Sequence, residues 1–372
     1  MTKISYFQGV IVIILLLTLG CESKQNQSKG IKSESVVINS FKNNLEIDQF
    51  LEPVDIDTEL FQVRTFITSN DYLFALCADK DTLIRVFDIN SLDYLGGFGY
   101  PGEGPEDLEF HMINASSFNV FENKLFITDR KYFRTILLDD LKDNIQHGDL
   151  KVIEKIPVPG SFIPVNDAFI KSDGNIYGVR SSTSKHLTVL NPKDLKIRDT
   201  LDFPSTHKDI PASAYHHLYR NNLQVSLNSN MVALAYLYFP MLRVYDFTKN
   251  SYLQVQVKPK NPQIENIPVA PNGRSIDNSN MFRYYYNVSV SNNLIAALYE
   301  ESGFIVKDGA GQRVSFDSPK MHIMDWSGSP EASLAIPTWV NVYTITPDGS
   351  HLIFFHPEEE NKLYKVKLSE LL

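Results

Sequence analysis

The chain has 372 residues, with 35 basic and 44 acidic side chains, so its formal net charge is −9 at pH 7. This acidic balance leaves no surplus of lysine and arginine to displace counterions from phosphates, so we expect no nucleic-acid partner. With only two cysteines, the chain is not a disulfide-rich scaffold, and stability has to come from a packed core.

The first 20 residues have the features of a secretory signal peptide. Lys3 precedes the apolar run Val10–Leu17, which is too short for the roughly 20 residues that span a bilayer. The run leads into Leu17-Thr18-Leu19-Gly20-Cys21, which resembles a bacterial lipobox, although Thr18 stands where leucine is usual. The resemblance implies that Cys21 is lipidated. A plain signal peptide cut elsewhere, or an uncleaved anchor, is the alternative.

Residues 21–35 are predicted to be a flexible tether. They are mostly Ser, Lys, Gln, Asn and Gly, with one large apolar residue, Ile31, which is too little to form a core. Beyond residue 20, the sequence has no other apolar stretch of membrane-spanning length. We therefore expect a protein of the bacterial cell envelope, held to the outer membrane by its N-terminal lipid, with its body periplasmic or surface-exposed.

Residues 36–372 contain six repeats. Each has a short apolar run, a polar turn rich in Asn, Asp or Gly, and a strongly apolar run. The first apolar residues after the turns are spaced 51 to 63 residues apart; they are Leu73, Leu125, Ile176, Met231, Leu294 and Leu352.

A second register supports these repeats. In most of them, another strand ends at a turn fourteen or fifteen residues after the apolar anchor, as at Arg85–Asp88 and Arg243–Asp246. Repeat five departs from this spacing because of an insertion that includes Gly303–Phe316. Four strands per repeat predict an all-β fold, a six-bladed β-propeller with four-stranded antiparallel blades.

The ring also has to close. Repeat six ends after its third strand, so we expect an N-terminal strand to close the last blade, with Ser35–Ile38 as the candidate. A β-sandwich or an irregular two-domain β protein is the alternative.

Two short strings resemble known propeller families. Thr346-Pro347-Asp348-Gly349 and the apolar run after it resemble the propeller repeat of TolB, and Gly96–Pro105 resembles the glycine-rich string between blades of NHL-type propellers. Together with the lipobox they identify the chain as similar to the TolB-like six-bladed propeller lipoproteins of Gram-negative bacteria. The resemblance implies an envelope location and a binding or scaffolding role, and it transfers no catalytic residues.

The glycine-rich string is predicted to cross from blade one to blade two. Its acidic neighbours argue against a phosphate-binding loop. They could chelate calcium or form a solvated acidic loop, which we favour; they are Glu103, Glu106, Asp107 and Glu109. The pair His216-His217 could hold a metal only in an irregular loop, and we predict neither a metal nor a cofactor.

The ligand-binding residues are expected on the loops that join one blade to the next, and on those between second and third strands, because both kinds lie on one face around the axis. The candidates are Tyr100, His111, Asp129, Arg130, Arg180, His216, Tyr219 and Arg274.

No catalytic motif is present, so the leading hypothesis is a non-enzymatic module that binds a protein, glycan or small ligand in the envelope. The alternative is a propeller hydrolase or lactonase with a divalent metal at the channel mouth.

Overall fold

The computed structural model describes residues 32–372 apart from 79–80, 105, 110–112, 114–116, 130, 149, 161, 163–164, 181–184, 205–209, 229, 264–266, 268, 271–272, 274, 279–280 and 308–309. The lipidation candidate Cys21 and the signal peptide lie outside the described residues. Among the described residues, no helix combines the length and the apolar character that a bilayer crossing needs.

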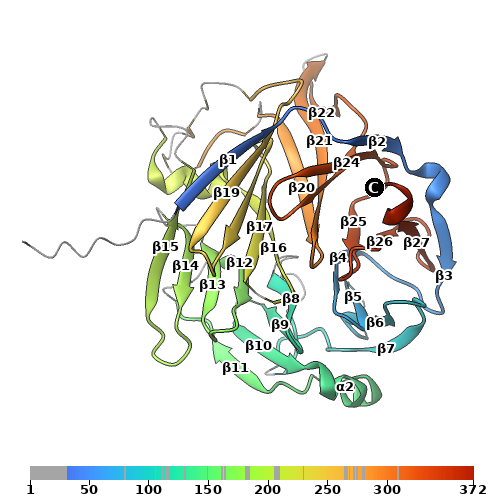
Figure 1. Ribbon diagram of the computed structural model, residues 1–372. Coiled ribbons are helices and arrows are strands. Elements are labelled where there is room, and N and C mark those ends of the chain that lie inside the picture. Colours follow the sequence, from blue (N-terminus) through green and yellow to red (C-terminus); the bar gives the residue numbers. More distant parts are fainter. Residues whose placement is uncertain are drawn as a thin grey trace, which may run out of the picture. The chain divides into compact units, whose positions relative to one another are not determined.

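Residues 33–372 form one compact unit built from six small antiparallel sheets around an axis (Figure 1). Blade one contains β4 (Val63–Thr68), β5 (Tyr72–Cys77), β6 (Ile84–Asp88) and β7 (Tyr94–Phe98). Blade two contains β8 (Phe118–Phe121), β9 (Lys124–Thr128), β10 (Tyr132–Leu137) and β11 (Glu154–Pro157). Blade three contains β12 (Val165–Ile170), β13 (Ile176–Arg180), β14 (Lys185–Leu190) and β15 (Ile197–Asp202).

The second half of the ring is more elaborate. Blade four contains β16 (Asn221–Val225), β17 (Met231–Tyr236), β18 (Met241–Asp246) and β19 (Ser251–Val257). Blade five contains β20 (Arg283–Val290), β21 (Leu294–Lys307), β23 (Lys320–Asp325) and β24 (Pro330–Ala335), with β22 (Ala310–Ser315) paired to the far end of β21. Blade six contains β25 (Val342–Ile345), β26 (His351–Phe355) and β27 (Lys362–Lys367). The predicted six-bladed propeller is confirmed.

Burial explains the repeating sequence pattern. Second strands such as β5 are buried almost throughout, because each blade packs its two faces against its neighbours. Outer strands such as β7 and β19 are only half-buried. At the predicted Pro-Asp-Gly turn of blade six, Gly349 has a φ of 75°, which favours glycine. The apolar runs after the turns are therefore the second strands, which are buried between neighbouring blades.

The axis of the ring is closely packed. Polar side chains on the innermost strands bond to the next blade: Asn119 Nδ2 donates to the Ala168 carbonyl at 3.1 Å, and Thr68 Oγ1 donates to the Ile345 carbonyl at 3.2 Å. The hydroxyls of Ser289 and Thr344 lie 3.0 Å apart. The cavity among these strands is ≈ 20 Å³, about enough for one water molecule. The described inner strands therefore leave little room for a ligand between them.

An N-terminal strand does close the last blade, but it is not the predicted one. β3 (Glu52–Asp55) pairs antiparallel with β27 and supplies the fourth strand of blade six. The candidate Ser35–Ile38 instead lies in β1 (Lys32–Ile38), which extends blade four next to β19. Pro53 is tolerated in β3 because an edge strand can leave one side unpaired. The first strand begins at Lys32, inside the segment predicted as a tether.

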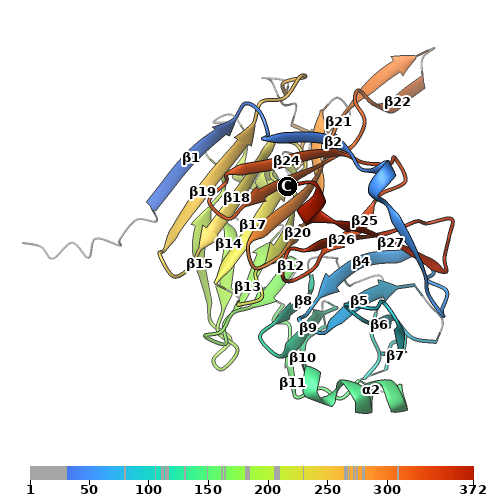
Figure 2. The same ribbon diagram turned by 45° about the vertical axis from the view of Figure 1, so that its right-hand side comes forward.

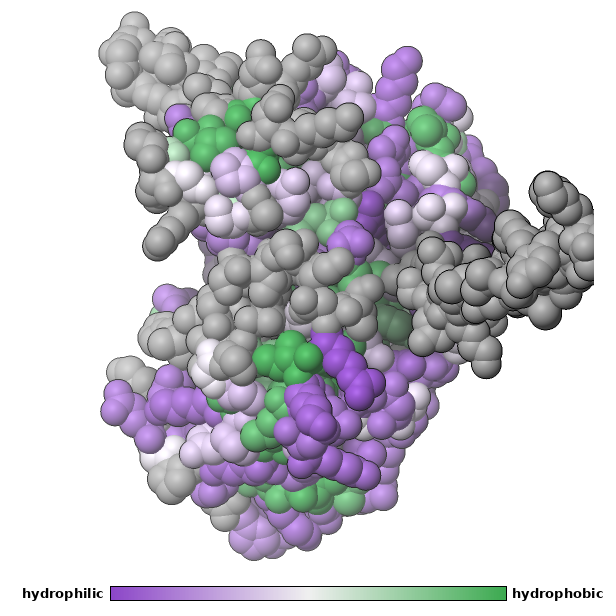
Figure 3. Space-filling model, turned by 90° about the vertical axis from the view of Figure 1, so that its left-hand side faces the viewer, coloured by the Kyte–Doolittle hydropathy of each residue, from purple (hydrophilic) through white to green (hydrophobic). Residues whose placement is uncertain are grey.

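The N-terminal segment thus follows the outer edges of three blades in turn. After β1, the strand β2 (Asn43–Glu46) pairs in parallel with β24 of blade five, and the chain then reaches β3 (Figure 2). Six of the seven residues of β1 are exposed, and Val37 is 55% exposed. The space-filling view of the side where β1 and β15 lie shows apolar areas separated by hydrophilic ones (Figure 3).

Candidate ligand-binding face

One face of the ring, which we call the loop face, carries the connections between blades and those between second and third strands. The predicted ligand residues come from these connections. His111, Arg130 and Arg274 lie outside the described residues, and Arg180 is the last residue of β13, with its side chain also outside what is described. Tyr100, Asp129, His216 and Tyr219 are described.

Tyr100 is the accessible member of this group, with 45% of its surface exposed. It lies within the glycine-rich string, two residues after β7 ends, and its hydroxyl lies against Gly148, the left-handed residue that ends helix α2 (Leu141–His147). A Cβ on Gly148 would lie 2.3 Å from the Tyr100 hydroxyl oxygen. Tyr100 therefore packs at the periphery, where the helix meets blade one.

All the hydrogen bonds shown for the Asp129 side chain go to residues just after it in the chain. Its side chain is 1% exposed; Oδ2 forms an ion pair with Arg134 Nη1 at 2.5 Å, and Oδ1 accepts hydrogen bonds from the backbone N–H groups of Lys131 and Tyr132. The Arg134 guanidinium also donates to the Asp107 carbonyl and lies 5.1 Å from the centre of the Tyr132 ring. Asp129 is therefore not available to a ligand from solvent in this structure.

Tyr219 is also buried, at 1% exposure, and stacks between Phe203 and Phe239 with ring centres 5.4 Å from each. It follows the short helix α3 (Tyr215–Leu218), which carries the histidine pair. The rings of His216 and His217 are 3.9 Å apart. Burial, followed by the neighbouring His217, lowers the pKa of His216 to about 4. Substituting Tyr219 would test packing rather than ligand contact.

The acidic neighbours of the glycine-rich string mostly have partners within the protein. Asp107 Oδ2 accepts from the Gly104 N–H at 2.8 Å, Glu109 pairs with Lys131, and Glu106 lies 3.0 Å from Lys155. In the described part of the chain, no group of three or more His, Cys, Asp and Glu side chains is arranged to hold a metal ion.

The largest departure from a regular blade is the insertion of blade five. Beyond its pairing with β23, β21 continues into a two-stranded ribbon with β22, from Ser302↔Ser315 to Lys307↔Ala310. The ribbon projects beyond the ring (Figure 2). At its base, a Cβ on Gly303 would come within 2.5 Å of Phe316 and 2.8 Å of Phe282, so these two rings close over the glycine.

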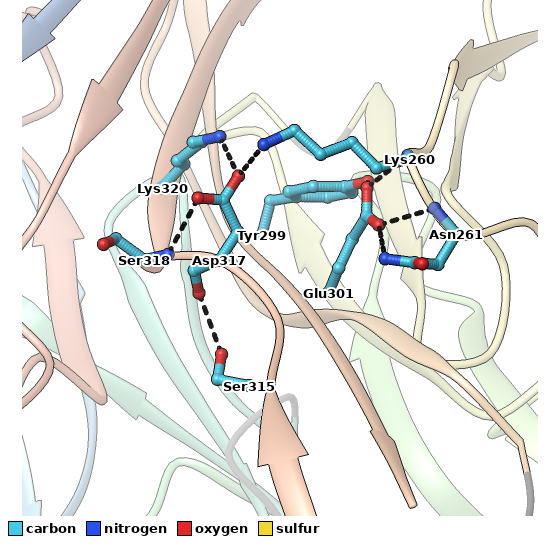
Figure 4. Close-up of polar contacts among 8 residues, drawn as sticks. All are labelled: Lys260, Asn261, Tyr299, Glu301, Ser315, Asp317, Ser318 and Lys320. Atoms are coloured by element: carbon cyan, nitrogen blue, oxygen red, sulfur yellow. Dashed lines mark hydrogen bonds and ion pairs between the residues drawn. The ribbon is translucent and has the colours of Figure 1, made fainter.

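A buried carboxylate at this base clamps the ribbon to the loop between blades four and five (Figure 4). Glu301 is 4% exposed. Its Oε1 accepts from the Lys260 N–H at 2.8 Å and the Tyr299 hydroxyl at 2.7 Å. Its Oε2 accepts from the N–H and the side-chain amide of Asn261 at 2.9 and 3.0 Å. The four donors satisfy the carboxylate, so it holds two segments together and has no free oxygen for acid–base chemistry.

A second carboxylate, near the surface, reinforces the clamp. Asp317 Oδ2 lies 2.7 Å from both Lys260 Nζ and Lys320 Nζ, and these two hydrogen bonds lower the pKa of Asp317 to about 2. Tyr284 adds a hydrogen bond of 2.6 Å from its hydroxyl to the Asn261 carbonyl. Burial is the main reason why the pKa values of Tyr284 and Tyr299 are raised, so both phenols stay protonated donors.

The sequence indicates the insertion but not the clamp. Glu301 accepts bonds from residues about 40 positions earlier, and no local pattern connects the two segments. The only available signal is a Tyr-x-Glu-Ser string where the other repeats end their second strand. The predicted ligand residues that the structure describes, side chain included, lie on three separate loops, and each contacts neighbours of its own.

Comparison with family models agrees with this architecture. A family model described as TolB-like 6-blade propeller-like matches residues 62–345. A solved structure of a DUF4221 family member from Bacteroides vulgatus is 11% identical, with a TM-score of 0.52 over 85% of this chain and 97% of that one. U3-55K and streptogramin B lyase are each 11% identical, with TM-scores of 0.43 and 0.42; they cover 85% and 86% of this chain, and 98% and 97% of theirs.

At these identities, the likeness to solved structures concerns the fold alone. The search of curated proteins found no match. The family model spans more than half of the chain and all of blades one to five. The chain therefore belongs to the TolB-like six-bladed propeller family.

Proposed function

We propose that this protein is a lipid-anchored binding module of the cell envelope, whose loop face captures a protein, glycan or small ligand without catalysing a reaction. The anchor is proposed from the lipobox-like string that ends at Cys21. The tether then holds the propeller at the membrane. Because propellers host unrelated functions, the binding role has to come from features of this chain rather than from its fold.

The observation that supports binding best is the clamped ribbon of blade five. A two-stranded ribbon is marginal by itself in water, yet this one is fixed at its base by Glu301, Asp317 and the Phe282–Phe316 contact. Rigid support for a projecting element favours recognition, because a pre-organised surface loses less conformational entropy on binding.

The outer part of the ribbon can be deleted while the residues at its base are kept. Joining Gly303 to Val314 through a two-residue Asn-Gly turn shortens the ribbon and keeps Glu301 and Asp317 in place. The full chain is expressed with its signal peptide, and envelope extracts are searched for co-purifying partners. We expect the shortened variant to lose the partner while its thermal unfolding temperature stays within a few degrees of the parent. Retention of the same partners would contradict a role for the ribbon.

The anchor is tested separately. Mass spectrometry of the mature N-terminus should find a diacylated Cys21, and a Cys21→Ser variant should leave the membrane fraction. Protease treatment of intact cells then distinguishes a surface-exposed body from a periplasmic one.

A further inference from the structure

The N-terminal strand enters the propeller on the face opposite the loop face. This opposite face, which we call the turn face, carries the turns between first and second strands and those between third and fourth strands. Glu34 of β1 attracts Lys249, which lies in the turn between β18 and β19. The Ile38 carbonyl, at the other end of β1, accepts a hydrogen bond of 3.3 Å from the Lys258 N–H, just after β19. β1 therefore starts at the turn face of blade four, whereas the ribbon of blade five projects on the other side (Figure 2).

The chain between the proposed lipid anchor and β1 is short compared with the propeller. Residues 21–31 join Cys21 to β1. A chain of this length spans about 20 Å on average as a random coil, and about 40 Å when fully extended. A folded unit of the size of residues 33–372 measures about 50 Å across. With Cys21 in the bilayer, the start of β1 stays close to the membrane surface, and the neighbouring parts of the turn face come nearest to it.

The turn between β14 and β15 lies on the same face, in the neighbouring blade three, and it exposes an apolar side chain. Leu195 in this turn is 42% exposed, and its φ of 54° lies in the left-handed region. Bulky residues rarely adopt that conformation. The turn starts at Asn191, whose Oδ1 accepts a hydrogen bond of 2.9 Å from the Lys193 N–H. Leu195 therefore combines an unfavourable backbone conformation with an exposed apolar side chain.

Equivalent turns in blades one and four show why this leucine is unusual. They begin at Asp88 and Asp246, which accept hydrogen bonds from N–H groups two residues later in the same way. Their left-handed residues are Leu92, with a φ of 63°, and Asn250, with a φ of 49°. Leu92 is only 2% exposed and packs in the core, while asparagine is among the residues that favour this conformation. Leu195 has neither compensation, so contact with an apolar phase outside the chain would explain its presence.

Positive charge surrounds this leucine, although the chain as a whole is acidic. Lys193, Lys196 and Arg198 are all exposed. Asp194, which pairs with Lys196 at 3.3 Å, is the one acidic residue between Lys193 and Arg198. An anionic lipid surface attracts such cations, and an apolar side chain beside them can enter the boundary between headgroups and acyl chains. The turn therefore has the composition of a small interfacial contact.

From these observations we infer that the Leu195 turn, residues 191–198, contacts the membrane that holds the anchor. Leu195 enters the headgroup region, and Lys193 and Arg198 lie against lipid phosphates. The inference rests on the proposed anchor at Cys21, and it adds a second membrane contact that turns the loop face and its ribbon away from the bilayer. One leucine and three cations bind a bilayer weakly, but a lipid tether raises their local concentration, so a weak contact suffices.

The orientation is tested with one fluorescent probe on the turn and one on the far side of the ring. Leu195→Cys and Leu95→Cys variants of the full chain are purified with diacylated Cys21 and labelled with a nitrobenzoxadiazole maleimide. They are reconstituted into vesicles of three parts phosphatidylethanolamine and one part phosphatidylglycerol. The remaining thiol, that of Cys77, is buried. Leu95 is the matched control, because it is also 42% exposed but lies in β7 of blade one, opposite blade four. Nitroxide-labelled lipid should quench most of the fluorescence at position 195 and little at position 95.

Variants that keep the fold test the side chains themselves. Leu195→Asn suits the left-handed backbone, so it should unfold at the temperature of the parent or above it. In the parent, vesicles should slow hydrogen exchange in residues 191–198 relative to detergent micelles, and Leu195→Asn should lose most of this protection. Lys193→Glu combined with Arg198→Glu should lose it as well, whereas Leu95→Asn should keep it.

The outcomes separate the turn from the anchor. If the labelled protein floats with the vesicles but both probes are quenched equally, or the probe at position 195 is not quenched, the inference is overturned and the anchor stands. If the protein does not float with the vesicles, the anchor fails and the inference fails with it. Equally strong quenching at position 195 on vesicles of phosphatidylcholine alone would overturn the role given to the cations.

Discussion

Blades two and five each bury a carboxylate, Asp129 just after β9 and Glu301 in the part of β21 beyond its pairing with β23, but they satisfy it in different ways. Asp129 in blade two has a buried cation, Arg134, on the strand that follows its turn, β10. Glu301 in blade five receives four hydrogen bonds without a direct cation, three of them from a loop that belongs to the preceding blade connection. Asp129 therefore stabilises one turn, whereas Glu301 joins two segments far apart in the sequence.

The difference matters for how each site responds to change. An ion pair in the interior depends on both partners, because either one left alone is an uncompensated buried charge. A carboxylate held by neutral donors leaves no buried charge behind when it is removed. Removing Asp129 should thus destabilise blade two by leaving a buried charge unpaired. Removing Glu301 should destabilise blade five by detaching the loop at Lys260 and Asn261 from β21.

The largest effect is expected at Asp129. Replacing it in Asp129→Asn leaves the Arg134 guanidinium buried without its counter-charge, which should lower the free energy of unfolding by about 3 to 5 kcal/mol. Urea denaturation monitored by fluorescence measures this. The double variant with Arg134→Met should recover much of the loss. If the double variant is no better than the single one, the pair is not the source of the effect.

At Glu301 we expect a smaller global effect and a clear local one. Glu301→Ala leaves the N–H groups of Lys260 and Asn261 without their acceptor, and the free energy of unfolding should fall by about 2 to 3 kcal/mol. Hydrogen exchange should accelerate in residues 258–263 and at the base of the ribbon, while blade two stays protected. Uniform acceleration around the ring would contradict the idea of a local clamp.

The buried histidine beside this clamp should respond to pH. His322 stacks on Tyr299 and Phe41, with ring centres 4.4 Å from each, and burial lowers its pKa to about 3. The unfolded chain has a histidine pKa near 6.5. Between these values the unfolded state binds the extra proton, so the stabilisation is complete above about pH 6.5 and decreases as the pH falls.

The slope is about 1.4 kcal/mol per pH unit for one histidine, which amounts to about 2 kcal/mol at pH 5. His186, whose pKa burial also lowers to about 3, contributes a slope of its own. In His322→Gln, the number of protons taken up on unfolding between pH 4 and 6 should therefore fall by one. The proton taken up by His186 should remain. An unchanged slope would mean that His322 is charged in the folded protein.

The smallest effect is expected at Asp317, which lies nearer the surface. Its pKa of about 2 is below the value of about 3.9 in an unfolded chain. Its contribution is therefore present above pH 4 and is lost as the pH falls through 2. Asp317→Asn should lower the free energy of unfolding at pH 7 by less than about 1 kcal/mol, and salt should reduce the difference. A salt-independent loss would indicate a packing role.

The ring could be predicted from the sequence because its signals are local. Each anchor residue, such as Leu73 or Leu294, begins or lies in the second strand of its blade, next to the turn that identified it. The closing strand could not, since Glu52–Asp55 contains proline and two carboxylates and looks less strand-like than Ser35–Ile38. What selects it is pairing with β27 at the other end of the chain.

In the candidate site, too, local features could be predicted and long-range contacts could not. The sequence indicates connections with unusual length or composition, and Tyr100 lies in one of them. It could not distinguish exposed residues from buried ones in these connections, so Asp129 and Tyr219 were selected although both are buried. The role of Glu301 depends on partners about 40 residues earlier, which a local pattern along the chain does not contain.

The position of β3 has a consequence for how the molecule reaches its native state. This strand is synthesised before the strands of blades one to five, yet its partner β27 lies almost at the C-terminus. Contacts between such distant segments form slowly, because the intervening chain has to be ordered first. Until the last residues are available, blade six lacks its third strand, and β3 stands unpaired. We therefore expect the ring to close late in folding, and a chain that lacks β27 to keep an open seam.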